Sequence, residues 1–226
     1  MTYRLLIADR SYSSWSLRGW LTFAAFGIPA EVVYARLYEP SFAGALKPFA
    51  PARTVPAVAL PEGGTLTDSL AIAEEIATRH PEAGHWPEDR ALRAIARSLV
   101  AEMHSGFMPL RDACPMNLRT SYKDVPISEA VQVDLKRIEM LWDHARTHAG
   151  EGSWLLGRYC LADVFYAPVA MRIAGYGLTV GDSARAYVNQ HLSDPNFLAW
   201  RALAMKDRPQ DIYRRDFTHR DWPAQI

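Results

Sequence analysis

The sequence has few cysteines, no excess of either charge and no long apolar run, and each lack excludes a class of protein. Two cysteines among 226 residues argue against a disulfide scaffold and against a metal site built on four cysteines. Twenty-five basic residues balance 25 acidic ones, so no overall positive field is available for a nucleic-acid backbone. Apolar runs such as Ala57–Leu60 fall far short of the roughly 20 residues that span a bilayer. We therefore expect no nucleic-acid partner and no membrane segment.

The N-terminus has no pattern typical of a secretion signal. Its apolar run is short, and Asp9 and Arg10 follow it directly, whereas a signal peptide needs a longer apolar stretch. Together with the low cysteine content, this favours a protein of the reducing cytoplasm.

The residues that are present indicate an ordinary folded chain of one or two domains. Hydrophobic residues make up 49% of the sequence and charged residues 22%, which excludes a largely disordered protein. His144 and His148 share a helix face four residues apart but lack a third ligand, so we expect no metal site.

The first 80 residues alternate between strand and helix patterns. Apolar and β-branched runs predict four strands, and helical spacing of apolar residues predicts helices over residues 16–26 and 68–79. The predicted strands are Tyr3–Ala8, Ala30–Leu37, Ala57–Leu60 and Thr65–Leu66. The order is β-α-β followed by β-β-α, and a hairpin after a crossover predicts a mixed sheet. Residues 38–54, with three prolines, are predicted as a loop.

The rest of the chain is predicted to be all-α. Residues 81–90 are rich in proline and charge and are predicted as a linker, which gives domains over 1–80 and 91–226. The predicted helices of the second domain are Ala91–Arg111, Glu129–His148, Leu161–Ala174, Ala184–Gln190 and Asn196–Met205. The polar and aromatic stretch 206–226 could cap a pocket, pack on the second domain or be mobile, and the sequence leaves these alternatives open.

Polar residues collect where predicted helices or strands begin. A serine-rich segment, Arg10–Arg18, precedes the first helix, and Asp68 and Ser69 precede the second. Such residues cap helices, and the same helix starts also bind anions through free N–H groups. Pro56 comes before a predicted strand, where a missing N–H is tolerated. Cys160-Leu161-Ala162-Asp163 has the spacing of a capping box, which is a structural device.

The order and spacing of these motifs resemble the cytosolic glutathione transferases over about residues 3–205. The segment Ser11–Leu21 is similar to the serine-rich entry to the first helix in the zeta-like branch and its bacterial relatives. Residues 105–111 are similar to the corresponding zeta helix, and Ala162–Val169 to the buried helix of the second domain. The resemblance implies a thioredoxin-like domain followed by an all-α domain, and a homodimer.

The resemblance implies that the first domain binds glutathione as a co-substrate. Val55 would offer its backbone to the cysteinyl unit, and Pro56 would be the family's cis-proline. Asp68 and Ser69 would hold the γ-glutamyl end, with Ser69 and the helix start binding its carboxylate. Arg53 and Lys47 are candidates for the glycyl carboxylate, although Lys47 could equally be a solvated surface charge.

The resemblance also implies a serine hydroxyl that donates to the glutathione thiolate. Ser13 is the first candidate for this catalytic role, and Ser11 and Ser14 are the alternatives. Cys114 and Cys160 both lie in the helical half, which argues against the cysteine-based chemistry of the omega class.

The electrophile pocket would lie between the domains. The candidate substrate-binding residues are Tyr12, Trp15, Met108, Arg111 and Arg172. Arg172 matches a zeta-class arginine that holds a substrate carboxylate, whereas Met108 stands where the zeta helix has glutamine. We expect a glutathione S-transferase that attacks a small electrophile. The alternatives are a maleylacetoacetate isomerase-like enzyme and a non-catalytic glutathione-binding module.

Overall fold

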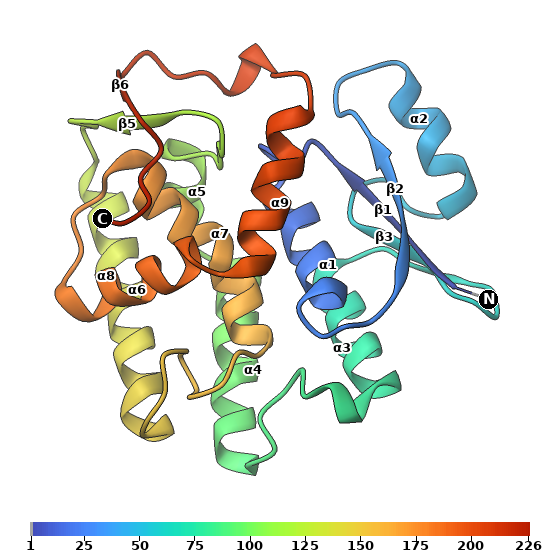
Figure 1. Ribbon diagram of the computed structural model, residues 1–226, viewed down its shortest axis with the longest axis horizontal. Helices are drawn as coiled ribbons and strands as arrows, with labels where there is room; N and C mark the ends of the chain where they lie inside the picture. The colour runs from blue at the N-terminus through green and yellow to red at the C-terminus, as the bar shows by residue number, and fades with distance from the viewer. Residues whose placement is uncertain (1) are drawn as a thin grey trace.

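A computed structural model describes residues 2–226, and its N-terminal part is built on one mixed four-stranded sheet (Figure 1). The strand order is β2-β1-β3-β4, with β1 (Tyr3–Ala8), β2 (Ala30–Ala35), β3 (Ala57–Ala59) and β4 (Thr65–Leu66). β1 and β2 run parallel because a helix crosses between them, whereas β3 is antiparallel to both β1 and β4. The predicted mixed sheet is confirmed.

The alternation of side chains along β1 gives the sheet two apolar faces. Leu5 and Ile7 pack with α1 (Ser14–Ala24) and α3 (Ser69–Arg79) on one face. Leu6 packs on the other face with the segment that holds α2 (Ser41–Leu46) and a short 3-10 helix, Lys47–Phe49. The prediction of a loop over 38–54 is therefore wrong at these two helical turns, which are too short to show a helical apolar period.

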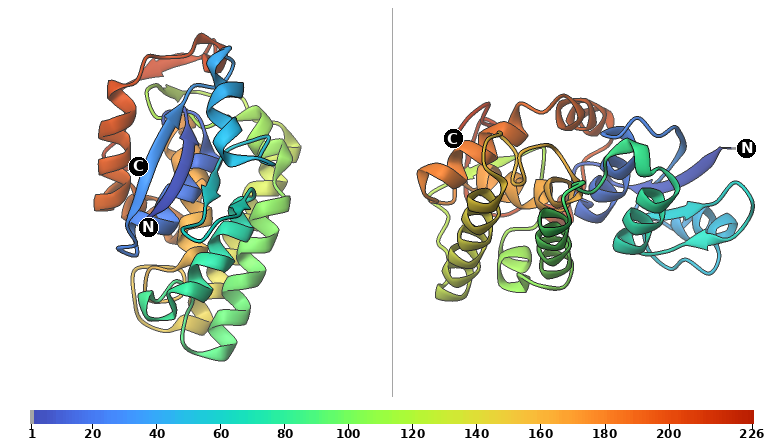
Figure 2. Two further views of the ribbon diagram at one scale, coloured as in Figure 1. Left: turned by 90° about the vertical axis from the view of Figure 1, so that its right-hand side faces the viewer. Right: turned by 90° about the horizontal axis from the view of Figure 1, so that it is seen from below.

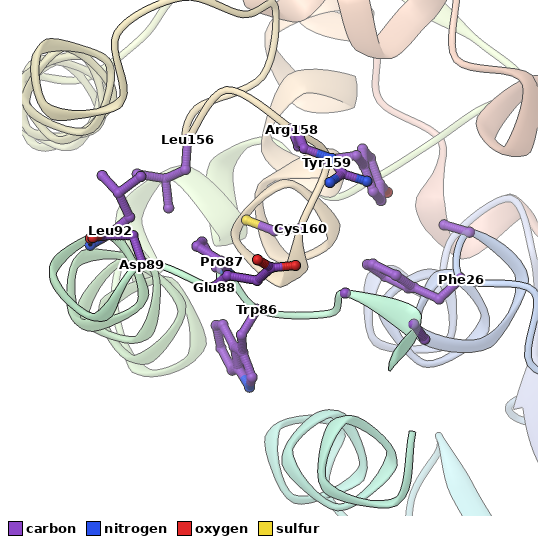
Figure 3. Close-up of a pocket in the computed structure, with 13 residues that line it drawn as sticks. Phe26, Trp86, Pro87, Glu88, Asp89, Leu92, Leu156, Arg158, Tyr159 and Cys160 are labelled. Atoms are coloured by element: carbon purple, nitrogen blue, oxygen red, sulfur yellow. The ribbon is translucent and has the colours of Figure 1, made fainter. Parts of the chain in front are cut away.

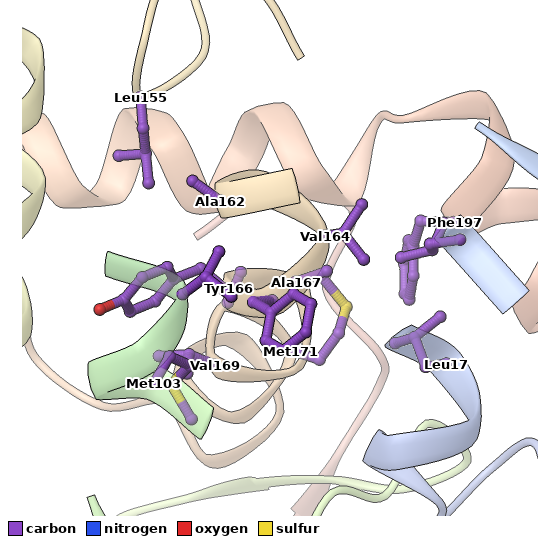
Figure 4. Close-up of a cluster of buried hydrophobic side chains, with 14 of the residues drawn as sticks. Leu17, Met103, Leu155, Ala162, Val164, Tyr166, Ala167, Val169, Met171 and Phe197 are labelled. Carbon is purple, nitrogen blue, oxygen red and sulfur yellow. The ribbon is translucent and has the colours of Figure 1, made fainter. Parts of the chain in front are cut away.

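The helical part packs around one buried helix. It contains α4 (Arg90–Ser105), α5 (Met108–Ala113), α6 (Glu129–Ala149), α7 (Leu161–Tyr176), α8 (Asp182–Leu192) and α9 (Pro195–Lys206). Every residue of α7 is buried, which agrees with its lack of a polar face. Figure 4 shows Val164 and Met171 of α7 close to Leu17 of α1, so the same core joins the two parts.

The helix predicted over Ala91–Arg111 is wrong at one point, because two helices replace it. α4 ends at Ser105, and Phe107 adopts the left-handed backbone conformation with φ +60°. A Cβ at Gly106 would lie 2.7 Å from the Glu102 carbonyl oxygen, so glycine permits the tight exit. Pro109 then stands in the first turn of α5, where its missing N–H costs nothing.

The second part is mostly helical, as expected, and it departs from an all-α domain where a short strand forms in the C-terminal tail. β5 (Ser121–Lys123) pairs antiparallel with β6 (Thr218–Arg220). A further 3-10 helix, Asp211–Tyr213, lies between α9 and β6. Three-residue strands far apart in the chain carry no period that a sequence could reveal.

Residues 206–226 pack against both parts of the molecule. Arg10 forms an ion pair with Asp207 at 2.9 Å, and Tyr12 stacks on Tyr213 with ring centroids 4.5 Å apart. Gln210 donates its amide N–H to the Tyr12 hydroxyl and its side-chain N–H to the Leu37 carbonyl. Figures 1 and 2 show that this tail passes between the two parts on one side of the molecule, whereas residues 80–90 join them on the opposite side.

Within residues 2–226, no helix combines the length and the apolar character that a membrane span requires.

Candidate functional site

The site begins with a hydrogen-bonded turn at the start of α1. The amides of Tyr12 and Ser13 both donate to the Asp9 carbonyl, which turns the chain from β1 into the helix. Ser13 is the N-cap residue, and its Oγ accepts the Ser16 N–H at 3.2 Å. The Ser13 hydroxyl donates to Ser16 Oγ at 2.9 Å, which in turn accepts the Ala8 N–H. One rotation of the Ser13 hydroxyl would free its proton for another acceptor.

The other hydroxyl groups of this segment point to different places. Ser11 is buried and donates to the Ala204 carbonyl of α9. Tyr12 faces the tail, as described above, and its burial raises the pKa of its hydroxyl. Ser14 is the first residue of α1, and its hydroxyl makes no hydrogen bond within residues 2–226. Of these candidates, Ser13 and Ser14 lie at the helix start itself.

The chain before β3 presents a free stretch of backbone. Val55 lies outside the sheet ladders, and neither its N–H nor its C=O is hydrogen-bonded to another group in residues 2–226. The Val55–Pro56 peptide bond is cis, as predicted. A Cβ at Gly19 of α1 would lie 2.6 Å from Pro56 Cβ, so glycine allows α1 to press directly on this turn.

The start of α3 offers a second free group. Asp68 caps the helix, with Oδ1 accepting the N–H groups of Leu70 and Ala71. Ser69 is 2% exposed, and its hydroxyl has no hydrogen-bond partner within residues 2–226. Buried hydroxyls are normally satisfied, so this group suggests a place where a ligand binds.

These free groups surround one cavity of about 260 Å³. Its lining residues come from three segments: Trp15, Thr54, Val55, Pro56, Thr67, Asp68 and Ser69. The structure thus brings together four of the six predicted glutathione-binding residues and Trp15. Arg53 and Lys47, the other two, are exposed and do not line the cavity. Thr54 and Thr67 were missed by the sequence analysis, although each adjoins a motif that it had singled out.

Two arginine side chains pack on the Trp15 ring. The guanidinium carbons of Arg18 and Arg111 each lie 4.7 Å from the centre of the Trp15 ring. Arg18 is 1% exposed, and its Nε and Nη1 atoms have no partner within residues 2–226. Burial, together with Arg172 and Arg111, holds the pKa of Arg18 well below its usual value. Sequence analysis gave Arg18 no role, because on a helix wheel it reads only as one charge among apolar residues.

Two other predicted substrate-binding residues, Arg172 and Met108, have different surroundings. Arg172 is buried and donates to the carbonyls of Cys114 and Pro168, and its burial lowers its pKa to about 10. Met108 is 50% exposed at the start of α5. Neither residue lines the cavity beside Trp15.

A larger cavity, of about 430 Å³, lies at the other end of α1. Figure 3 shows Phe26, Trp86, Glu88, Arg158 and Tyr159 around it. Cys160 also lines it, and burial raises the pKa of its thiol well above the usual value. The free polar groups described above do not converge here, so the smaller cavity is the stronger candidate site. The described residues contain no group of three metal-ligating side chains.

Comparison with known proteins places the N-terminal part in a family. Residues 12–79 match the family model of the glutathione S-transferase N-terminal domain. A curated relative, the probable maleylacetoacetate isomerase of Caenorhabditis elegans, is 32% identical over 103 residues. That match covers 46% of this chain and 47% of the relative, so it spans about half the length of each.

Solved structures match nearly the whole chain. The maleylacetoacetate isomerase of Anaeromyxobacter dehalogenans, solved with glutathione in its active site, is 26% identical with a TM-score of 0.65. The match covers 92% of this chain and 98% of that one. A glutathione transferase homolog from Burkholderia with bound glutathione has a TM-score of 0.67 at 22% identity, over 91% and 99% of the two chains. The omega 3C glutathione transferase of Trametes versicolor has a TM-score of 0.67 at 19% identity, over 88% and 89%.

Proposed function

We propose that the chain is a glutathione transferase, which binds glutathione in the cavity beside Trp15 and adds its thiol to a small electrophile. One observation carries the proposal: the buried Ser69 hydroxyl and the backbone of Val55, all without partners, belong to residues that line the same cavity. Relatives solved with bound glutathione support the choice of ligand.

Each free group matches one part of glutathione. The backbone of Val55 pairs with the cysteinyl unit, as a strand would. Ser69 and the N–H groups at the start of α3 hold the γ-glutamyl carboxylate, since a helix N-terminus favours an anion. Asp68 accepts from the γ-glutamyl amino group through Oδ2, because Oδ1 is occupied by the helix cap. For the glycyl carboxylate we keep Arg53 and Lys47 as candidates, since both are exposed and without an ion pair in residues 2–226.

We assign the activation of the thiol to Ser13. Its hydroxyl proton turns from Ser16 Oγ to the glutathione thiolate, while Ser16 Oγ keeps the Ala8 N–H. A hydrogen bond to a charged group is worth about 1.5–3 kcal/mol, against about 1 kcal/mol for the neutral bond given up. The start of α1 adds about 0.3–1 kcal/mol. At 1.36 kcal/mol per unit, the sum lowers the thiol pKa by roughly half a unit to two units from about 8.5.

A titration of the thiolate absorbance of bound glutathione tests this assignment. We expect a thiol pKa near neutrality in the wild type and a return towards the free value in Ser13→Ala. Ser11→Ala is the matched control, because the Ser11 hydroxyl is bonded to α9 and its loss should leave the shift in place. A shift that survives Ser13→Ala moves the role to Ser14. Tight binding without any shift in the wild type contradicts the catalytic proposal and leaves a glutathione-binding module.

A second candidate is a glutathione-dependent isomerase of the maleylacetoacetate type. The unpaired Nε and Nη1 of Arg18 favour it, because a substrate carboxylate would satisfy them, and Arg111 packs on the same Trp15 ring. Two relatives carry that name. The test compares kcat/KM for a carboxylate-bearing electrophile and for its methyl ester. A preference for the carboxylate that Arg111→Met reduces about tenfold supports this candidate, whereas equal rates favour general conjugation.

We also propose a homodimer with domains over residues 1–80 and 91–226. α6 exposes Val133 and Met140, each 59% accessible, and a groove of about 450 Å³ lies between α4 and α6. We expect Met140→Glu to give a monomer in sedimentation, and Leu198→Glu on α9 to leave the dimer intact.

The buried cysteines, Cys114 and Cys160, are unpaired, which supports the reducing cytoplasm as the location.

A further inference from the structure

His104 connects the helical part to the glutathione cavity. It is the second-last residue of α4, yet its Nε2 lies 3.5 Å from Oδ2 of Asp68, at the start of α3. Its ring meets Trp15 edge-on, with centroids 5.3 Å apart and an angle of 79° between the planes. Both neighbours line the cavity, whereas His104 stands behind them.

The contact reaches the one oxygen of Asp68 that the helix cap leaves free. Oδ1 already accepts two backbone N–H groups. Rotation of the carboxylate would break these two hydrogen bonds, which cap α3. A carboxylate oxygen accepts two hydrogen bonds. Oδ2 can therefore take one bond from His104 Nε2 and one from a ligand amino group at the same time.

The remaining contacts of His104 hold its ring in place. Nδ1 is buried without a partner within residues 2–226, so the tautomer with the proton on Nε2 buries no unpaired N–H. Phe165 of α7 lies 6.4 Å away between ring centroids. The charged groups around it are Asp68, Arg111, which donates to the His104 carbonyl, and Arg18, which packs on the same Trp15 ring.

We infer that His104 is a positioning residue for glutathione, which acts by fixing the Asp68 carboxylate towards the γ-glutamyl amino group. The inference rests on the proposed glutathione site and goes beyond it, because it adds a residue of the helical part to glutathione recognition. The 3.5 Å contact shortens to a hydrogen bond when glutathione binds, as such contacts do on ligand binding. His104 therefore affects the affinity for glutathione and leaves the reacting thiol untouched.

Two substitutions separate the hydrogen bond from the packing. His104→Phe keeps an aromatic edge against Trp15 but removes the donor. His104→Gln places an amide donor near the position of Nε2. We expect His104→Phe to weaken glutathione binding about five- to tenfold in calorimetry and to raise KM for glutathione equally, with kcat and the bound thiol pKa unchanged. His104→Gln should recover most of the affinity.

A double-mutant cycle with Asp68→Asn tests the route of the effect. If His104 acts through Asp68, adding His104→Phe to Asp68→Asn weakens binding no further. Additive losses overturn the inference, and so does equal affinity of wild type and His104→Phe. A fall in kcat at constant KM also overturns it, because the residue would then act on the reacting groups. If the wild type itself binds no glutathione, it is the proposed function that fails.

Discussion

Two buried polar clusters in this protein differ in how completely their groups are paired. At the start of α7, the Asp163 carboxylate accepts from Tyr187 and from the N–H groups of Leu155 and Cys160. Beside Trp15, Arg18 is equally buried, but two of its nitrogen atoms have no partner within residues 2–226. A satisfied cluster costs little in the folded state and specifies structure, whereas an unsatisfied one destabilises the fold until a ligand arrives. The contrast separates structural polar groups from the candidate site.

The largest expected effect comes from breaking the satisfied cluster. Asp163→Ala leaves the Tyr187 hydroxyl and two buried N–H groups unpaired. We expect the free energy of unfolding to fall by about 3–5 kcal/mol in urea denaturation, by analogy with other broken buried networks. Asp163→Asn keeps one acceptor and should lose less. A loss below about 1 kcal/mol in Asp163→Ala would mean that the cluster does not support the fold.

The pH dependence of stability sharpens the same comparison. Burial lowers the pKa of His191, which packs on Tyr187, to about 3 from 6.5. The unfolded chain therefore takes up a proton that the native state does not bind, and His191 lowers the free energy of unfolding by about 2.5 kcal/mol between pH 7 and pH 4.5. Asp163 acts in the opposite direction, because its pKa is raised to about 6 from 3.8, and it adds about 2 kcal/mol over that range.

His191→Phe isolates the histidine contribution. We expect the change in unfolding free energy between pH 7 and pH 4.5 to differ from wild type by about 2.5 kcal/mol, with the variant losing less stability at the lower pH. Urea denaturation at several pH values measures it. Parallel profiles for the two proteins would show that His191 accepts a proton in the folded state.

Ser69→Ala tests the unsatisfied side of the comparison. The hydroxyl has no partner in residues 2–226, so its removal should change stability by less than about 0.5 kcal/mol. Glutathione affinity should fall roughly 10- to 150-fold, since a hydrogen bond to a carboxylate is worth about 1.5–3 kcal/mol. Ser98→Ala on the exposed face of α4 is the control for calorimetry. Unchanged affinity would remove Ser69 from the site.

Arg18→Met gives a small expected effect on stability, but one with a clear sign. Replacing a buried, unpaired cation by an apolar side chain should leave the unliganded protein as stable as wild type or about 1 kcal/mol more stable. Arg137→Met, which breaks an exposed ion pair with Glu102, should cost up to about 1 kcal/mol. A loss above about 2 kcal/mol in Arg18→Met would mean that the guanidinium has a structural partner.

The sequence predicted the parts of the site that depend on local chemistry. The caps at Ser13 and Asp68 and the turn at Pro56 are each specified by a few neighbouring residues, and their order along the chain matched a known fold. The break at Gly106 and Phe107 was missed because the apolar spacing continues across it.

The features that depend on distant contacts could not be read in this way. Ser11 and Tyr12 belong to the serine-rich segment, yet they face α9 and the tail, and only the packing of residues some 190 positions later decides this. Arg18 is notable for its unpaired buried nitrogen atoms and His104 for its contact with Asp68, and no local sequence pattern indicates either feature.

The contacts of the tail with Arg10 and Tyr12 restrict how the two parts of the molecule can move. Residues 80–90 join the two parts at one side of the molecule, and the tail fastens them at the opposite side (Figure 1). Because the two parts are connected on opposite sides, they cannot separate by rotating about a single hinge. On the proposed function, an electrophile would reach the site without separation of the two parts.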